Sequence, residues 1–431
     1  MSPQIVCIIT LILVVAALIS NKIPSAAIGL GIPFLMILGG VFETPLKAMS
    51  DLAGPSTMLV CCIMILSQGI FKSGLAEKIG GAMLKATGGR NSETAVLMII
   101  IVVSAVMSMF LPNTGCTTIL LPICIAISMC SGISRSRTLF VMNLAVGLGG
   151  SITAMGTTIN TACRGLIQDN GYGTVSFFGF GISAIPALIV GVIYMLTIGR
   201  RFLPNWVKEN TASTDEVAKQ EELTPAEAAK KKRRMIFAGI AFVLQVFGVV
   251  AESWTGVQAW VFGLAGVLIL LLTKTISEKE AFQIPWGTLF FVFGTSVMAT
   301  GFKLAGVAEM MIGPVKAILG ESPSPTILTL VLFTLGAVCT QFMSNFGTFG
   351  IFSGVAITLA ESIGANPSTL VIALALGCNS SYATPMATTA NAVIIGDGEI
   401  KFTDWLKNGI PHIIFAGIFS VILLPIFFPF Y

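Results

Sequence analysis

Long apolar stretches constrain what this chain can fold into more than any other feature of its sequence. A helix needs about 20 mostly apolar residues to cross the hydrocarbon core of a bilayer. Only 10% of the residues are charged, against about 25% in a soluble globular protein. The sequence therefore predicts an all-α polytopic membrane protein. Helical spans are expected near residues 4–20, 26–42, 57–72, 138–160, 177–199, 236–252, 257–273, 286–301, 369–391 and 408–430.

Two further apolar stretches, 94–129 and 326–360, are each interrupted midway by a polar motif, "LPNTG" in the first and "MSNFG" in the second. Lys and Arg accumulate on the cytoplasmic side of a membrane protein, so the basic run that ends the hydrophilic stretch 204–234 places this stretch inside. With the spans given above, each interrupted stretch must then enter and leave the membrane on the same side. We predict two re-entrant hairpins, the first dipping from the cytoplasm and the second from outside.

Sequence matches recur along the chain at an offset of about 232 residues. Asn113 matches Asn345 at this offset, and "MGTTIN" matches "MATTAN" at an offset that is one residue shorter. These matches predict two repeats of five spans plus one hairpin each. Because five is odd, the second repeat has inverted topology. The expected division is 1–203 for the first repeat, 204–234 for a cytoplasmic basic linker and 235–431 for the second repeat.

Interrupted helices at membrane depth indicate a binding site. Backbone without regular helix is tolerated there only where it is buried in protein or lines a cavity, and inverted repeats with broken helices are typical of secondary transporters. We expect the inverted arrangement to bring four broken segments together at the centre of a multi-pass protein of the cell's inner (plasma) membrane. These segments are residues 112–115, 156–160, 344–347 and 387–391.

The residue types at the breaks favour a small anion coupled to a cation. No acidic residue lies in the central part of a predicted span, which disfavours a proton relay, and the single histidine, His412, is expected at the membrane interface. A cation would be held by neutral oxygens, as sodium accepts. Helix starts leave unpaired N–H groups that bind anions such as carboxylates. Isolated Ser, Thr and Gly also serve helix packing, whereas paired Asn113 and Asn345 favour a binding role.

The motifs resemble those of the divalent anion/sodium symporter family of di- and tricarboxylate transporters, over essentially the whole chain. The family's signature is a Ser-Asn-Thr triplet at the tip of each hairpin, and "LPNTG" and "MSNFG" stand at these places. The resemblance implies a homodimer in the lipid bilayer. It also implies a scaffold domain and a transport domain that moves like an elevator.

The resemblance also implies the site residues. Substrate would bind at Asn113, Thr114, Thr157, Ser344, Asn345, Thr388 and Thr389. A first sodium ion would use Ser108, Asn113 and the backbone at Gly156. A second would use Thr340, Ser344, Asn345 and the backbone at Ala387. We expect sodium as the coupling ion, no cofactor, no enzymatic activity and no nucleic-acid partner.

Two residues depart from the triplets, since Pro112 stands in place of the first Ser and Phe346 in place of the second Thr. The substrate therefore stays open among dicarboxylates, tricarboxylates, sulfate-like and smaller anions. The leading hypothesis is sodium-coupled uptake of a succinate-like dicarboxylate. A sodium-independent anion exchanger, a cation/proton antiporter and an anion channel are the alternatives.

Overall fold

All regular structure in the described part of the chain is helical. The computed structural model describes residues 2–20, 22–75, 78, 86, 92–205, 225–284, 286–307, 324–342, 344–385 and 387–431. The first half contains α1 (Pro3–Ser20), α2 (Ser25–Leu38), α3 (Pro45–Met49), η1 (Ser50–Ala53), α4 (Pro55–Ser73), α6 (Glu93–Ser108), α7 (Asn113–Ser131), α8 (Arg135–Gly150), α9 (Thr158–Asp169), α10 (Gly181–Leu196) and η2 (Gly199–Arg201). The second half contains α12 (Pro225–Thr255), α13 (Ala259–Leu272), α14 (Glu278–Ala281), α15 (Trp286–Ala305), α17 (Pro325–Cys339), α18 (Asn345–Ser362), α19 (Pro367–Asn379), α20 (Thr389–Gly398) and α21 (Phe402–Phe427).

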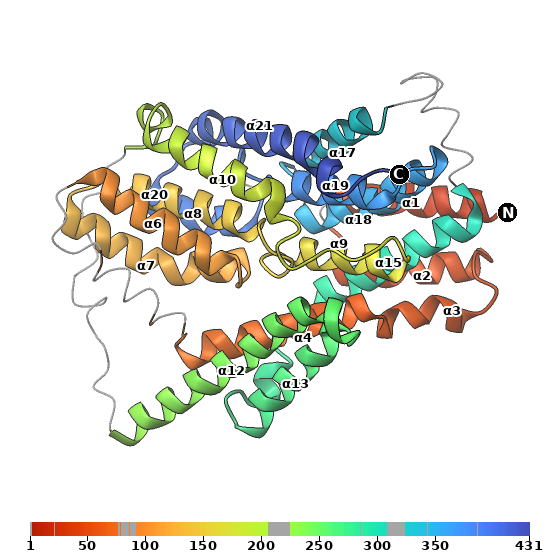
Figure 1. Cartoon of the computed structure of the whole chain (residues 1–431), viewed down its shortest axis with the longest axis horizontal. Coiled ribbons are helices and arrows are strands. Elements are labelled where there is room, and N and C mark those ends of the chain that lie inside the picture. Colours follow the sequence, from red (N-terminus) through yellow and green to blue (C-terminus); the bar gives the residue numbers. More distant parts are fainter. Residues whose placement is uncertain are drawn as a thin grey trace.

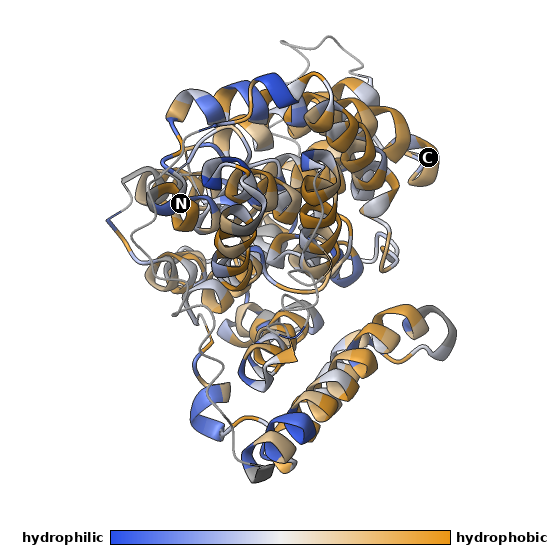
Figure 2. Ribbon diagram, turned by 90° about the vertical axis from the view of Figure 1, so that its left-hand side faces the viewer, coloured by the Kyte–Doolittle hydropathy of each residue, from blue (hydrophilic) through white to orange (hydrophobic). Residues whose placement is uncertain are grey.

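The helix surfaces are suited to a bilayer. Within the described residues, α12, α15 and α21 are each long and apolar enough to cross a membrane, and most of the shorter helices are apolar too. Figure 2 shows hydrophobic residues along most helical turns. On α21, every fourth residue from Ile410 to Ile426 is an exposed isoleucine. Such a stripe is unfavourable in water, whereas lipid chains accommodate it.

The helices fall into a core and a group along one side (Figure 1). α12 packs on α13, and both pack on α4, so these three helices lie together along the lower side in that view. α4 connects this group to the core through α9. On another side of the core, α15 packs on both α2 and α18.

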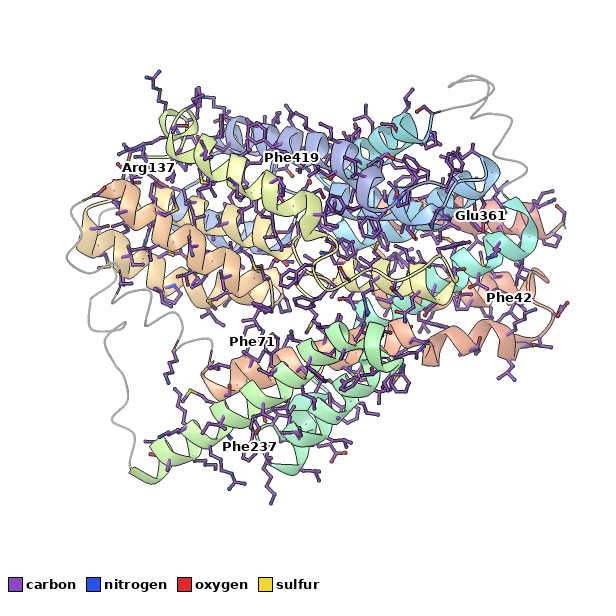
Figure 3. The ribbon with its side chains drawn as sticks, viewed as in Figure 1. Phe42, Phe71, Arg137, Phe237, Glu361 and Phe419 are labelled. Carbon is purple, nitrogen blue, oxygen red and sulfur yellow. The ribbon has the colours of Figure 1, made fainter. Side chains whose placement is uncertain are left out.

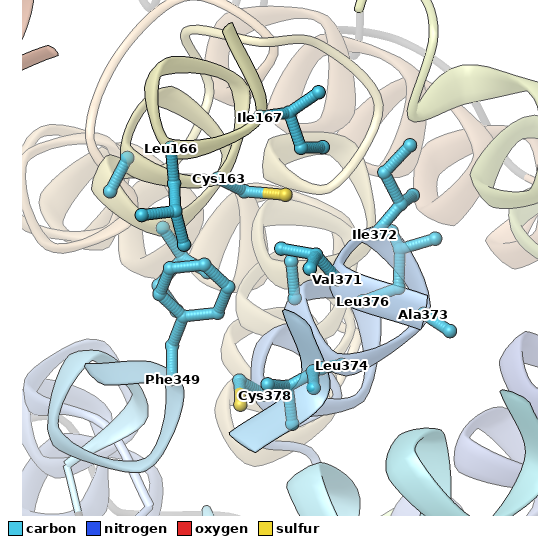
Figure 4. Close-up of a cluster of buried hydrophobic side chains, with 14 of the residues drawn as sticks. Cys163, Leu166, Ile167, Phe349, Val371, Ile372, Ala373, Leu374, Leu376 and Cys378 are labelled. Atoms are coloured by element: carbon cyan, nitrogen blue, oxygen red, sulfur yellow. The ribbon is translucent and has the colours of Figure 1, made fainter. Parts of the chain in front are cut away.

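The largest buried cluster joins the two halves of the chain (Figure 4). Cys163 and Ile167 of α9 lie against α19, whose residues from Leu370 to Leu376 are almost all fully buried. Phe349 of α18 belongs to the same cluster. Burying apolar side chains this completely gives dense packing, which holds the helices around the broken segments in fixed positions.

Two of the expected spans, 138–160 and 369–391, are broken into two helices each. The first consists of α8 and α9, and the second of α19 and α20. Their non-helical segments run over residues 151–157 and 380–388, in which Met386 lies outside the described residues. The bounds predicted for these breaks are therefore wrong. The non-helical backbone begins several residues earlier, and the second Thr and the Asn of each motif already belong to the next helix.

Threonine caps restart the helix after each break. The Oγ1 atom of Thr157 accepts a hydrogen bond from the backbone N–H of Asn160 at 3.2 Å. Thr388 accepts the same bond from the N–H of Asn391 at 3.1 Å. Such a cap pairs one of the N–H groups that a helix start leaves without a partner. The caps explain why both helices begin directly after these threonines.

Three further expectations can be compared with the structure. α12 begins at Pro225, so the basic residues 230–234 lie in a helix and not in a linker, while residues 206–224 lie outside the described part. His412 is fully buried in the protein, and its Nδ1 and Nε2 atoms lie 2.6 Å and 3.2 Å from the carbonyl oxygens of Asn408 and Gly191. Its place at the membrane interface stays a prediction. The interrupted stretches 94–129 and 326–360 do break at their polar motifs, where α6 gives way to α7 and α17 to α18.

Candidate functional site

The first half-site lies where α6 ends and α7 begins. Ser108 is the last residue of α6, Asn113 is the first of α7, and the Ser108 hydroxyl donates to Asn113 Oδ1 at 2.8 Å. Ser108 is fully buried, whereas Asn113 is partly exposed. The bond fixes the Asn113 amide and turns its oxygen toward the end of α6. We call Ser108, Asn113, Gly150 and Gly156 the first half-site.

Two glycines allow backbone to approach these side chains closely. A Cβ atom at Gly150 would overlap Asn113 Oδ1 and would lie 3.1 Å from Ser108 Oγ. A Cβ atom at Gly156 would lie 2.8 Å from the Ser108 carbonyl oxygen and would overlap the Gly150 carbonyl oxygen. Glycine therefore brings backbone and side-chain oxygens from three segments together. An all-oxygen, uncharged set of this kind suits a hard cation such as sodium.

The second half-site repeats this arrangement between α17 and α18. The Thr340 hydroxyl lies 2.7 Å from Asn345 Oδ1 and 2.9 Å from the Cys378 carbonyl oxygen. Asn345 Nδ2 donates to Ser381 Oγ at 3.0 Å. Ser344 caps α18, because its Oγ accepts from the N–H of Gly347 at 2.9 Å. We call Thr340, Ser344, Asn345 and the segment 380–388, which contains Ala387, the second half-site.

An asparagine side chain holds each broken segment open. Asn160 Nδ2 donates to the carbonyl oxygens of Ser151 and Thr153, at 3.2 Å and 2.8 Å. Asn391 Nδ2 donates to the corresponding oxygens of Ser381 and Thr384, at 3.0 Å and 2.8 Å. Buried carbonyl groups that leave a helix need new partners, and these amides supply them.

The structure brings the predicted substrate residues Thr114 and Thr389 together across the two halves. Their hydroxyl oxygens lie 2.7 Å apart, and both residues are exposed. This contact joins the first turn of α7 to the first turn of α20. Thr157 and Thr388 are half-buried caps of α9 and α20, so their hydroxyl oxygens already accept backbone bonds. The other predicted residues stay within their own half-sites.

The two departures from the family triplets have different structural consequences. Pro112 occupies the N-cap position of α7, where it forms no side-chain cap. Phe346 turns toward α15, and its ring centroid lies 5.7 Å from that of Phe291. The ring also packs against two buried hydrophobic clusters. Phe346 thus packs α18 against α15, so its bulk is used in helix packing.

Three buried amides around the half-sites were not predicted from the sequence. Gln341 donates to the Ser380 carbonyl oxygen at 2.9 Å and accepts from the N–H of Ala383 at 3.0 Å. Asn143 Nδ2 donates to Asn391 Oδ1, and Asn379 Nδ2 donates to Asn160 Oδ1, each at 2.7 Å. An amide inside an apolar run is expensive to bury without partners, so their position in the sequence was an available signal.

Among the described residues, the ion pairs between charged side chains lie outside the half-sites. Arg164 of α9 is buried and pairs with Glu252 of α12. Gln168 donates to the same carboxylate at 2.6 Å. Lys303 of α15 lies 3.7 Å from Glu361 of α18, whose position Figure 3 marks. These pairs connect the core to neighbouring helices, and the half-sites themselves consist of uncharged residues.

Comparisons with known proteins agree with this architecture. A sequence profile of the family described as "Citrate transporter" matches residues 15–353. The sodium-dependent dicarboxylate transporter SdcS of Staphylococcus saprophyticus is 24% identical over 421 residues, covering 91% of this chain and 80% of that protein. Its Staphylococcus aureus counterpart is 24% identical over 430 residues, covering 91% and 79%.

Two solved structures are similar in fold. The YdaH transporter of Alcanivorax borkumensis superimposes with a TM-score of 0.65 at 16% identity, covering 99% of this chain and 98% of that one. MtrF of Neisseria gonorrhoeae, from a class of antimetabolite efflux pumps, superimposes with a TM-score of 0.64 at 14% identity. The match covers 99% of this chain and 95% of the MtrF chain. At these identities the likeness concerns the fold alone.

Proposed function

Because this chain belongs to the citrate transporter family, we propose that it is a secondary active transporter that takes up dicarboxylates together with sodium. The family match confirms the resemblance drawn from the two hairpin motifs. The family and the curated relatives are transporters and not enzymes. The names of those relatives support sodium as the coupling ion and a dicarboxylate as the substrate.

The doubled hydroxyl–asparagine arrangement is the observation that carries this proposal. Ser108 donates to Asn113 Oδ1 at 2.8 Å, and Thr340 lies 2.7 Å from Asn345 Oδ1. Each pair bridges a helix end and a helix start. Two such oxygen clusters, one in each half of the chain, support one sodium ion in each.

The helix starts support binding of an anion beside the sodium ions. α7, α9, α18 and α20 all begin at the broken segments. A helix start carries unpaired N–H groups and the positive end of the helix dipole. Thr114 and Thr389 add exposed hydroxyl groups where α7 meets α20. Two carboxylates of one substrate would bind these groups while the sodium ions supply positive charge.

Reciprocal packing supports two inverted repeats. α7 packs on α20 and α18 packs on α9, so the helix after each hairpin tip contacts the helix after the other half's break. The proposal extends to an elevator motion, in which α4, α12 and α13 belong to the scaffold and the helices around the half-sites move. The proposal also includes a homodimer in the plasma membrane, which the family resemblance implies.

Uptake of labelled succinate into proteoliposomes tests the proposal. Purified protein is given an inward sodium gradient, and an equal potassium gradient serves as the control. We expect accumulation above equilibrium only with sodium. Equal uptake in both salts would contradict sodium coupling. Absence of uptake for di- and tricarboxylates, even with substrate inside the vesicles, would contradict the substrate class.

Pro112 favours one second candidate, an anion exchanger that needs no sodium. The first half-site lacks the hydroxyl that Ser344 supplies in the second. With a weakened first sodium site, substrate inside would exchange for substrate outside. Counterflow in sodium-free medium distinguishes this function, since a symporter with two working sodium sites shows almost none.

A further inference from the structure

The two halves of the chain hold each other's broken segments through a reciprocal pair of asparagine bonds. Asn143 of α8 donates to Asn391 of α20, and Asn379 of α19 donates to Asn160 of α9, each at 2.7 Å. In both cases the donor lies in one half of the chain and the acceptor in the other. All four side chains are at most 4% exposed.

The acceptors in these bonds are the residues that keep the breaks open. Asn160 binds the carbonyl oxygens of Ser151 and Thr153, and Asn391 binds those of Ser381 and Thr384. Each acceptor amide therefore uses its NH₂ group on its own break and its oxygen on the opposite half. Rotation of the amide would break both sets of bonds at once.

The donors are themselves oriented by few partners. Asn143 Oδ1 accepts from the hydroxyl of Thr117 on α7 at 3.1 Å, which links the bond to the first hairpin. Among the described residues, Asn379 Oδ1 has no hydrogen-bond partner, so Asn160 is the residue that orients its amide. Buried amide–amide bonds are strong in a low-dielectric interior.

We propose that Asn143 and Asn379 are positioning residues that couple the two half-sites, so that sodium binding in one half-site orders the broken segment of the other. This inference rests on the proposed sodium coupling. The path runs from each half-site through its break to the opposite half. Sodium binding is then cooperative, because ordering one break removes part of the ordering cost at the second.

The test measures sodium-dependent thermal stabilisation of the purified protein in detergent, with choline replacing sodium at constant ionic strength. The wild-type protein should show a steep sodium dependence, with a Hill coefficient above one. In Asn143→Leu and Asn379→Leu the half-saturating sodium concentration should rise about tenfold or more, as when supports of metal ligands are removed. The Hill coefficient should fall to about one, because the sites become independent.

Asn408→Leu is the matched control. Asn408 is fully buried, and its amide donates to the carbonyl oxygens of Phe202 and Asp404 at 2.9 Å, neither of which belongs to a half-site. This variant should lower the melting temperature without changing the sodium dependence. If either asparagine variant fails to fold, Thr117→Val carries the test, since it removes only the bond that orients Asn143. It should raise the half-saturating sodium concentration by a smaller factor.

Three outcomes would overturn the inference. An unchanged Hill coefficient and half-saturating concentration in Asn143→Leu and Asn379→Leu, beside a sodium-responsive wild type, would overturn the coupling alone. An equal change in Asn408→Leu would reduce the effect to a general loss of stability. No sodium response in the wild-type protein would overturn both the coupling and the proposed symport.

Discussion

The two half-sites share their central bond but differ in how firmly the surrounding backbone is held. In the second half-site, the Gln341 side chain binds Ser380 and Ala383, and the Gln341 carbonyl oxygen accepts from the Thr384 hydroxyl at 2.7 Å. Met109 stands at the corresponding place in the first. Its carbonyl oxygen accepts from the Thr153 hydroxyl, but a thioether cannot replace the amide bonds.

The helix starts also give the second half-site more support than the first. Ser344 caps α18 through the N–H of Gly347, whereas Pro112 gives α7 no side-chain cap. The second half-site is thus more strongly preorganised, and the first depends more on what binds there. The comparison indicates that a doubled site need not have two equal halves, and it assigns the adaptable part to the first hairpin.

The largest expected effect is a loss of transport when the asparagine that both half-sites share is replaced. Asn113→Ala and Asn345→Ala should each reduce sodium-driven uptake about 100-fold, because a ligand to a charged group is worth about 3 kcal/mol. Proteoliposome transport measures the loss, and gel filtration checks the fold. Asn170→Ala is the control, since among the described residues its amide donates to Leu166 alone, in the last turn of α9. A variant of either site residue that transports normally would remove that half-site from the account.

The difference in backbone support should appear in stability. Gln341→Leu should lower the free energy of unfolding by about 2 kcal/mol, because buried groups of Ser380 and Ala383 lose their partners. Met109→Leu preserves shape and should cost less than about 1.5 kcal/mol. Thermal unfolding in detergent compares the two variants. Equal costs would mean that the second half-site is no more strongly held than the first.

Substitutions at the two N-cap positions should change the free energy of unfolding by smaller amounts and in opposite directions. Ser344→Ala should cost about 1 kcal/mol, as for other lost helix caps. Pro112→Ser should gain less than that, because the restriction that proline imposes on the unfolded chain is lost. The same unfolding measurement applies. A stabilising Ser344→Ala change would contradict the cap assigned to this hydroxyl.

The smallest effect concerns the contact between the halves. Thr114→Val and Thr389→Val should each weaken substrate binding by about 1 kcal/mol, and the double variant should lose little more, because the partners share one hydrogen bond. The half-saturating succinate concentration measures the change at saturating sodium. Fully additive losses would indicate that the two hydroxyl groups act independently.

The sequence predicted the all-helical membrane fold and the two interrupted stretches because their signals are local or periodic. Apolar length gave the spans, and the breaks near Asn113 and Asn345 stand out as polar residues inside apolar runs. Pairing across the chain could not be predicted in this way. The bond between Asn143 and Asn391 depends on how α8 packs on α20, and no local pattern encodes that contact. The break positions were displaced because threonine caps begin the next helix earlier than expected.

The number of sodium ions moved with each substrate tests the doubled site most directly. Labelled sodium and labelled succinate are followed together in the first seconds of uptake into proteoliposomes. The account predicts about two or more sodium ions for each dicarboxylate, one from each half-site. A ratio of one or less would contradict it, because one of the two oxygen clusters would then carry no coupling ion.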